Sequence, residues 1–192
     1  MKRIYLIRHA PTSAAAGVLL GATDLDVDPA RLHLADRLVD QLPARARVLC
    51  SPLRRARQTC ERLGLGGSGQ VEYTDDLREI DFGHWEERSF ADISGKDPEA
   101  VARWSADPQG FCFPGGESIR AFTARIQRCC AALEGGGEDD IILVSHGGPL
   151  RALIAAMLRL PSEASLLFQV KHCRLGIVHL HDQGGVLVGL NL

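Results

Sequence analysis

The sequence predicts an α/β fold, a three-layer α/β/α sandwich with a mostly parallel central sheet. Short apolar segments of strand length alternate along the chain with longer segments of helical periodicity, an alternation typical of parallel sheets covered by helices. The clearest strand, 141–144, is a continuous apolar run, as expected where both sheet faces are covered. With 192 residues, 45% of them hydrophobic, we expect one domain over 1–192 with a substantial core.

The first elements each carry a local signal. Residues 3–7 are β-branched and bounded by charge, which favours a buried strand. A loop follows over 10–28, and Pro29 opens a helix, since proline is favoured at a first helical position. A second strand at 47–50 precedes a helix that starts at Ser51-Pro52 and runs to about Leu63.

The middle of the chain is less regular. The glycine-rich stretch 64–70 predicts a flexible turn, and 71–73 a short strand. Residues 77–114 are polar and irregular and contain both tryptophans. We interpret 77–114 as an excursion that caps the active-site end of the sheet and not as a second domain.

The last elements complete the sandwich. Apolar residues recur at helical spacing from Ile119 to Leu133, and glycines end that helix. After strand 141–144, Pro149 is expected to be the first residue of another helix. Segments 175–180 and 186–190 flank a DQGG turn, which predicts a hairpin.

Charge and composition exclude several classes of protein. The 22 basic and 24 acidic side chains give a net charge of −2, which argues against nucleic-acid or polybasic membrane binding. No apolar run has the length of a membrane span, and the apolar stretch near the N-terminus is too short for a signal peptide. The six cysteines form no CxxC pair. We therefore expect a cytoplasmic protein whose cysteines are small buried hydrophobic residues.

Three predicted strands run directly into polar clusters. Strand 3–7 leads into Arg8-His9, strand 47–50 into Ser51 and three arginines, and strand 141–144 into Ser145-His146-Gly147-Gly148. Ligands of parallel sheets gather outside the carboxyl ends of the strands. Two histidines and at least two arginines would converge there, beside a helix N-terminus, and such a set suits a phosphate dianion.

Four ordered segments strengthen this interpretation: LIRHAPT, SPLRRARQT, LREIDFGHWE and ILVSHGG. They resemble the histidine phosphatase superfamily, the fold group that includes the phosphoglycerate mutases. The segments spread from Leu6 to Gly148 in the family's order. The resemblance implies a phosphoglycerate mutase-like fold and a phosphatase that needs no metal and no cofactor.

The resemblance also implies roles for individual residues. His9 would be the nucleophile that becomes phosphorylated, His146 would donate to the phosphoryl oxygens, and Glu79 would be the proton donor and acceptor. The substrate phosphate would be bound by Arg8, Arg55, Thr12 and Gly147. Imidazole attacks only when the reacting nitrogen is unprotonated, and a backbone carbonyl after the strand could hold that tautomer. Neighbouring arginines would keep the ring neutral and stabilise charge on the phosphoryl oxygens.

Some features leave alternatives open. Glu86 is the second choice for the proton donor, because only the motif match selects Glu79 among several nearby carboxylates. Ala10 and Glu87 stand where glycine is commoner in the family, and no asparagine follows in 13–16. None of these changes removes a member of the core set, so an active enzyme is expected.

The short chain and the segments GATDLDVD, FPGGES and GVLVGLNL resemble the α-ribazole phosphatases. Those enzymes remove the 5′-phosphate of α-ribazole phosphate in cobalamin assembly. The resemblance thus implies a small-molecule phosphate ester as partner. A broad-specificity phosphatase or a phosphoglycerate mutase of the same superfamily is the alternative.

Two hypotheses lie outside this class. One is an inactive phosphate-binding protein, against which the intact set of histidines and arginines argues. The other is a metal protein built on His172, Cys173, His179 and His181, which lack convincing ligand spacing. Substrate specificity is expected from the excursion, with the candidates His84, Trp85, Trp104, Phe111 and Phe113. The C-terminal hairpin offers an edge through which a homodimer could form.

Overall fold

The computed structural model describes residues 1–66 and 71–192 and contains a sheet of six strands in the order β3-β2-β4-β1-β5-β6. β1 pairs in parallel with β4, β4 with β2, and β2 with β3, whereas β5 and β6 are antiparallel additions beside β1. The strand bounds are β1 Lys2–Arg8, β2 Arg47–Cys50, β3 Glu72–Tyr73, β4 Asp140–Ser145, β5 Leu175–His181 and β6 Gly184–Gly189.

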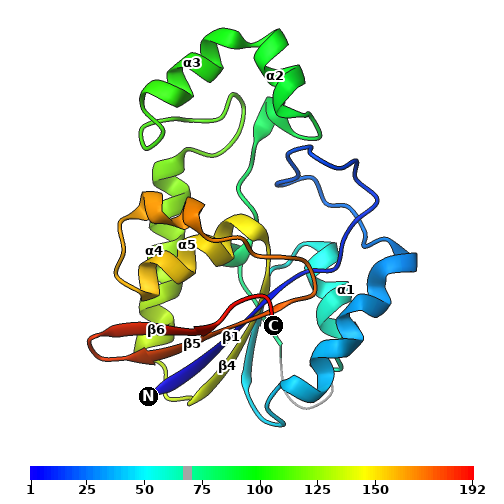
Figure 1. Cartoon of the computed structure of the whole chain (residues 1–192), viewed down its shortest axis with the longest axis vertical. Coiled ribbons are helices and arrows are strands. Elements are labelled where there is room, and N and C mark those ends of the chain that lie inside the picture. The colour runs from blue at the N-terminus through cyan, green and yellow to red at the C-terminus, as the bar shows by residue number, and fades with distance from the viewer. Residues whose placement is uncertain (67–70) are drawn as a thin grey trace.

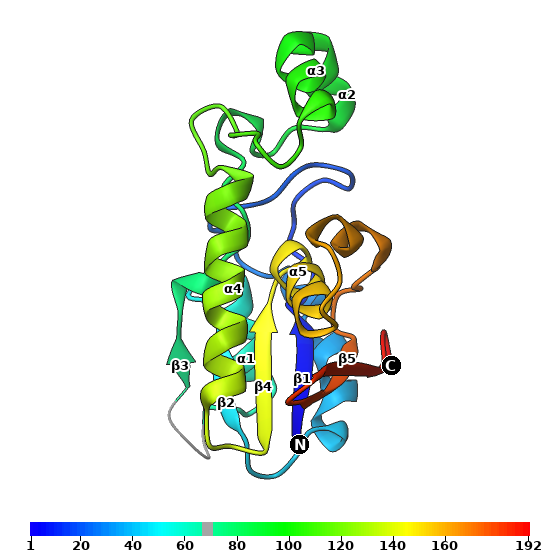
Figure 2. The same cartoon turned by 90° about the vertical axis from the view of Figure 1, so that its left-hand side faces the viewer.

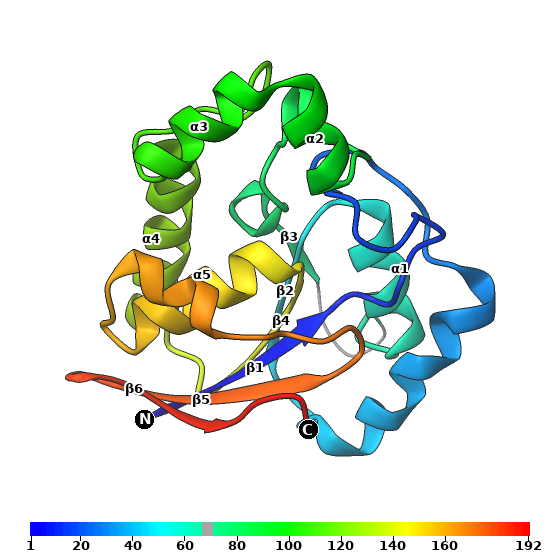
Figure 3. The ribbon, with the colours of Figure 1, turned by 45° about the horizontal axis from the view of Figure 1, so that its top comes forward.

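Helices cover both faces of this sheet, as Figure 3 shows. On one face, α4 (Ile119–Gly135) and α5 (Gly147–Met157) pack on one set of alternate strand residues, including Ile4, Leu6 and Leu143. On the other face, α1 (Arg54–Arg62) and a 3₁₀ helix at Pro29–Gln41 pack on the intervening set, including Ile7 and Val144. Successive side chains of a strand point to opposite faces, so both sets are buried. The predicted α/β/α sandwich with a mostly parallel sheet is confirmed.

The excursion 77–114 differs from its prediction as an irregular segment. It contains two short helices, α2 (Phe90–Lys96) and α3 (Pro98–Ala106), which stand beyond the carboxyl ends of β1 and β4 (Figures 1 and 2). Their start signals are local: Ser89 and Asp92 form a capping box, and Asp97 caps α3 just before Pro98. The helices are too short to show a clear hydrophobic period, and so the pattern alone missed them.

Several boundaries also differ from the predictions. The helix at Pro29 is wound as a 3₁₀ helix, α5 begins at Gly147 and not at Pro149, and α1 begins at Arg54, after Ser51 and Pro52. A 3₁₀ helix at Ser162–Leu167 was not predicted. Residues 67–70 of the predicted turn 64–70 lie outside the described residues.

Two further features bear on the expectations from composition. Five of the six cysteines are buried as predicted, but Cys112 is exposed, and all six are free thiols. Among residues 1–66 and 71–192, no helix has both the length and the apolar character that a membrane span needs.

Candidate active site

The strand ends bring the predicted residues together at the carboxyl edge of the sheet. Arg8 ends β1 and pairs with Ser145 of β4, and the His9 N–H donates to the Ser145 carbonyl at 2.9 Å. The Ser51 N–H, just beyond β2, donates to the Val144 carbonyl at 2.9 Å. The rings of His9 and His146 lie 4.9 Å apart, centroid to centroid. Two histidines from different strands therefore share one site, as predicted.

His9 is held as a neutral imidazole in one tautomer. Its side chain is buried, and its Nδ1 lies 2.7 Å from the Ala10 carbonyl oxygen. A carbonyl only accepts, so Nδ1 carries the proton and Nε2 keeps its lone pair. Burial, followed by the positive charge of Arg55, holds the pKa of His9 well below its usual range. Nε2 is therefore a ready nucleophile at neutral pH.

Arg55 and His146 form a fully buried pair behind His9. The Arg55 Nε–H donates to Nδ1 of His146 at 3.2 Å, so His146 carries its proton on Nε2. That Nε2–H donates to the Ser51 hydroxyl at 2.8 Å. Both ring nitrogens of His146 thus contact protein groups, and donation to a phosphoryl oxygen would have to replace the Ser51 contact. Burial, then the charge of neighbouring groups, also holds the pKa of His146 well below its usual range.

Arg8 offers a buried donor. Its Nη1 donates to the Val170 carbonyl at 2.8 Å, whereas its Nε is buried and has no hydrogen-bond partner among the described residues. A buried donor without a partner costs on the order of 1–3 kcal/mol, so an anion that accepts from Nε would stabilise the site. Arg55 donates from Nη1 to the Thr23 carbonyl and from Nη2 to the Gly21 carbonyl. Because each of these nitrogens carries two N–H groups, one N–H on each is left for a further acceptor.

The structure distinguishes between the two candidate carboxylates. Glu79 lines the cavity beside Arg8, and its Oε2 accepts from the Gly148 N–H at 3.0 Å. Glu86 instead accepts from four backbone N–H groups, those of Gly21, Ala22, Thr23 and Phe82. Glu86 therefore supports the loop whose carbonyls bind Arg55. Of the two, only Glu79 lines the cavity.

A cavity of about 470 Å³ opens at this site. Arg8, Glu79, Gly147 and Gly148 line one part of it, and the remaining wall comes from residues 18–20, Phe82, Arg151 and 166–170. His9, Arg55 and His146 are buried next to this first part and do not themselves form the cavity wall. None of the five specificity candidates of the excursion lines it. Trp85, Phe111 and Phe113 form a buried cluster of their own, against which the half-buried Trp104 packs. These four aromatic residues therefore do not form part of the cavity wall. The fifth candidate, His84, packs its ring against Gly115.

Comparisons with known proteins agree with this arrangement. The family model described as "Histidine phosphatase superfamily (branch 1)" matches residues 4–192. The chain belongs to the histidine phosphatase superfamily. It is 33% identical to the adenosylcobalamin/alpha-ribazole phosphatase of Salmonella typhimurium, over 88% of this chain and 86% of that protein. It is 25% identical to phosphoserine phosphatase 1 of Hydrogenobacter thermophilus, over 100% of this chain and 93% of that protein.

Among solved structures of the superfamily, the alpha-ribazole phosphatase from Shigella flexneri superposes with a TM-score of 0.88 at 32% sequence identity. The match covers 99% of this chain and 96% of that one. The superfamily predicted from the four motifs is therefore confirmed.

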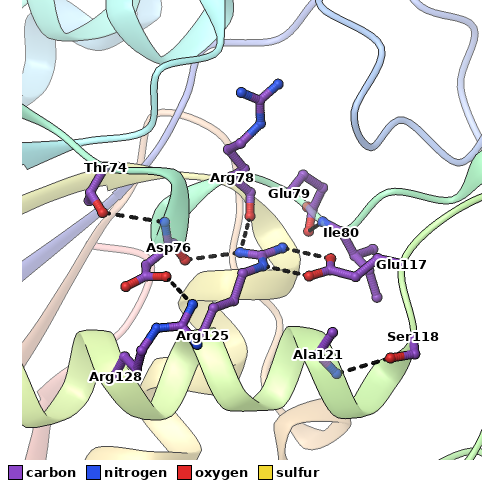
Figure 4. A network of polar contacts seen from close by, with 10 residues as sticks. All are labelled: Thr74, Asp76, Arg78, Glu79, Ile80, Glu117, Ser118, Ala121, Arg125 and Arg128. Atoms are coloured by element: carbon purple, nitrogen blue, oxygen red, sulfur yellow. Dashed lines mark hydrogen bonds and ion pairs between the residues drawn. The ribbon is translucent and has the colours of Figure 1, made fainter.

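The loop that carries Glu79 is fixed by a largely buried ion pair on α4 and the segment before it (Figure 4). Arg125 of α4 donates through Nε and Nη2 to Glu117 at 2.8 and 3.0 Å. Its Nη1 donates to the carbonyls of Asp76 and Arg78, at 2.9 and 2.6 Å. Since Arg78 directly precedes Glu79, this contact fixes the backbone that places the carboxylate.

His172 is a site residue that sequence reasoning did not place here. Its ring packs edge-on against that of His9 at 4.9 Å, and its Nδ1 lies 2.7 Å from the His9 carbonyl oxygen. Burial lowers the pKa of His172 to about 4. The N–H of Cys173 also donates to the Arg8 carbonyl at 3.0 Å. The segment before β5 therefore braces the backbone of Arg8 and His9. A lone histidine between two strands gave no signal of this contact.

The two remaining predicted phosphate-binding residues differ in position. Gly147 lines the cavity, and a Cβ there would lie 3.3 Å from Cζ of Arg8. Gly148 is constrained further, because a Cβ would lie 2.2 Å from Oε1 of Glu79. Thr12 is buried and is not part of the cavity wall; its hydroxyl oxygen lies 3.4 Å from the Ala14 nitrogen.

The residues of the metal-site hypothesis are divided between different surroundings. His172 contacts His9, whereas His179 and His181 belong to β5. Within the described part of the chain, no group of three or more histidine, cysteine, aspartate or glutamate side chains is arranged to hold a metal ion.

Proposed function

We propose that this protein is a phosphomonoesterase that hydrolyses a small phosphate ester through a phosphohistidine on His9, with α-ribazole 5′-phosphate as the substrate. One observation carries the reaction: His9 is buried and neutral with a free Nε2, and the preceding residue in the chain, Arg8, has a buried Nε–H without a partner among the described residues. A nucleophile and a phosphate-binding donor are thus adjacent before any substrate enters.

In the first step, Nε2 of His9 attacks the phosphorus, and the bond from phosphorus to the ester oxygen breaks. Arg8 and Arg55 stabilise the charge on the phosphoryl oxygens, and the N-terminus of α5 adds to this field. Glu79, in its protonated form, gives its proton to the departing alkoxide. Thr12 and Gly147 keep the implied role of shaping the phosphate pocket.

In the second step, water attacks the phosphohistidine and Glu79 takes up its proton, which releases phosphate and restores His9. His146 supports both steps by keeping its ring beside His9, and it donates from Nε2 when a phosphoryl oxygen replaces Ser51 as acceptor. The family resemblance supports these roles, and the proposed chemistry needs neither a metal nor a cofactor.

The identity of the ester rests on the relatives. Proteins named as alpha-ribazole phosphatases cover this chain at 32–33% identity, whereas the phosphoserine phosphatase covers it at 25%. A broad-specificity phosphatase is the second candidate. A phosphoglycerate mutase is the third, and it would return the phosphoryl group to an acceptor and not to water.

Three expectations from composition remain proposals beside the reaction. They are a single domain over 1–192 with the 77–114 excursion as its cap, a cytoplasmic location without nucleic-acid partners, and a homodimer paired through the hairpin. Sedimentation of the purified protein tests the last of these directly.

The proposed function is tested by phosphate release from α-ribazole 5′-phosphate, phosphoserine and glycerol 3-phosphate, with EDTA present throughout. Wild type should release phosphate, fastest from α-ribazole 5′-phosphate, and His9→Ala should release none. His33→Ala, which changes an exposed histidine, is the matched control and should behave as wild type. Activity that persists in His9→Ala would contradict the mechanism. Equal rates on all three esters would contradict only the choice of substrate.

A further inference from the structure

The active-site cavity has a second end whose character differs from that of the phosphate site. Away from Arg8 and Glu79, its wall is formed by apolar side chains from three separate segments of the chain. They are Leu19, Leu20, Phe82, Leu166, Leu167 and Phe168. These side chains can remove apolar ligand surface from water.

Two of these side chains are unusually exposed. Leu166 and Leu167 are 74% and 82% exposed, more than any other large hydrophobic residue that the structure describes. Single exposed leucines are common on protein surfaces, but an adjacent pair at the mouth of a cavity marks a binding surface. Both belong to the 3₁₀ helix at Ser162–Leu167.

The segment that carries the leucines is connected to the phosphate site. It packs against α5, the helix that begins at Gly147 (Figure 3). Three residues after Leu167, the Val170 carbonyl accepts from Nη1 of Arg8 at 2.8 Å. The position of the apolar surface relative to Arg8 is therefore fixed. A site that binds both the phosphate and the organic group of one ligand needs such a fixed spacing.

The charges of the cavity wall are also confined to one region. Its charged residues are Arg8, Glu79 and Arg151. Burial lowers the pKa of Arg8 and the charge of Arg151 lowers it further, so this second cation acts near the phosphate end. The apolar residues of the other end bring no charge, and a charged group there would lose hydration without gaining a partner.

We propose that Leu166 and Leu167, with Leu19 and Phe82, bind part of the organic group of the substrate, and that this part is uncharged and apolar, of the size of an aromatic ring system. The inference rests on the proposed phosphatase activity and adds the class of ester. Because leucine contacts of this kind hold ground state and transition state alike, they should act on KM and leave kcat nearly unchanged.

The test compares two alkyl esters with similar leaving groups, 2-naphthylmethyl phosphate and glycerol 1-phosphate. Wild type should prefer the naphthylmethyl ester. In the double variant Leu166→Ser/Leu167→Ser, kcat/KM for that ester should fall roughly tenfold or more through KM, with less than about a twofold change for glycerol 1-phosphate. The matched control is Val186→Ser/Val188→Ser on β6, where the side chains are 57% and 54% exposed. It should change neither value.

The other outcomes each decide a separate point. An equal loss on both esters, or no loss on either, would overturn the apolar subsite while leaving the phosphatase proposal intact. No turnover of any ester by wild type would overturn the proposed function itself. If the leucine variant instead converts a dimer to a monomer in sedimentation and keeps its ester preference, the leucines bind a second copy of the chain, and the subsite is again refuted.

Discussion

The two ends of the active-site cavity are built from different kinds of structure. At the phosphate end, His9, Arg55 and His146 are buried, and each follows directly from a strand or lies in the helix after one. At the apolar end, Leu166 and Leu167 are exposed and belong to the 3₁₀ helix at Ser162–Leu167. The difference separates chemistry, which needs preorganised donors, from recognition, which can change by surface substitution.

This division makes a general prediction about substitutions. A change at the phosphate end should lower kcat for every ester, because each ester presents the same phosphoryl group. A change at the apolar end should lower kcat/KM only for esters whose organic group contacts the leucines.

Glu79→Gln should break the phosphate end most selectively. For alkyl esters we expect kcat to fall by about 10²–10⁴-fold, because the alkoxide loses its proton donor. For 4-nitrophenyl phosphate, whose leaving group needs no proton, the formation of the phosphoenzyme should be almost unchanged. Rapid-quench kinetics measure both. The same leaving-group dependence in Glu86→Gln, with none in Glu79→Gln, would show that the carboxylates were assigned the wrong way round.

Gly148→Ala tests the close contact between the start of α5 and Glu79. The added Cβ would lie 2.2 Å from Oε1 of Glu79, so the carboxylate must move away from the leaving group. We expect kcat for alkyl esters to fall by roughly 10-fold to 100-fold, since a misplacement of about 1 Å costs on the order of 10²-fold. Gly95→Ala in α2 meets no atom within 4 Å and serves as the control. Similar kinetics for the two variants would refute this contact.

Arg125→Met should sharpen the comparison by acting at a distance. It leaves Glu117 and the carbonyls of Asp76 and Arg78 without their donor, and breaking such a buried pair costs about 3–5 kcal/mol of unfolding free energy. Chemical denaturation measures this cost. Arg128→Met removes an exposed ion pair to Asp76 and should cost less than about 1 kcal/mol. Equal costs would show that burial does not set the strength of this network.

The contribution of Arg125 to placing Glu79 has a separate readout. If Arg125 acts through the backbone before Glu79, phosphoenzyme formation in the variant should slow more with alkyl esters than with 4-nitrophenyl phosphate. A purely structural role would lower both rates together.

His172→Gln should have the smallest effect, seen in stability against pH. The pKa of His172 is about 4 in the folded protein and about 6.5 when unfolded. Between these values the unfolded chain binds a proton that the folded protein does not, so stability is lost as pH falls from 6.5 toward 4. Glutamine can still donate to the His9 carbonyl but does not titrate. The free energy of unfolding of His172→Gln, from denaturation curves at each pH, should therefore fall less steeply as pH falls. The difference in slope from wild type should reach up to about 1 kcal/mol per pH unit.

Because His172 is partly exposed, solvent weakens the effect of burial on its pKa, and the slope of about 1 kcal/mol per pH unit is an upper value. Parallel stability curves for wild type and His172→Gln between pH 7 and pH 4 would contradict the lowered pKa.

The phosphate end could be predicted from the sequence because its residues are tied to strand ends. Once 3–7, 47–50 and 141–144 are recognised as parallel strands, Arg8, His9 and His146 must meet at one edge. The choice between Glu79 and Glu86 could not be made in this way, since it depends on which carboxylate lines the cavity and which supports the loop at 21–23. The same is true of His172, whose role arises from a contact with His9 across 163 positions of sequence.

The apolar end was predicted in the wrong place for a physical reason. Aromatic residues of the excursion, such as Trp85 and Phe113, were expected to contact substrate, but they bury one another and stabilise the excursion itself. Leu166 and Leu167 look like ordinary core positions in the sequence. Only the packing of their segment on α5 shows that they face outward, at the cavity mouth.

The central claim, a phosphoryl group on His9, is tested most directly in Glu79→Gln turning over 4-nitrophenyl phosphate. Phosphoenzyme formation needs no proton donor with this ester, whereas attack by water has lost its base, so the intermediate should accumulate. Quenching at alkaline pH, followed by peptide mass spectrometry, locates the phosphoryl group. The account predicts it on His9 alone. A phosphoryl group on His146 or His172, or continued turnover with no phosphorylated histidine, would contradict it.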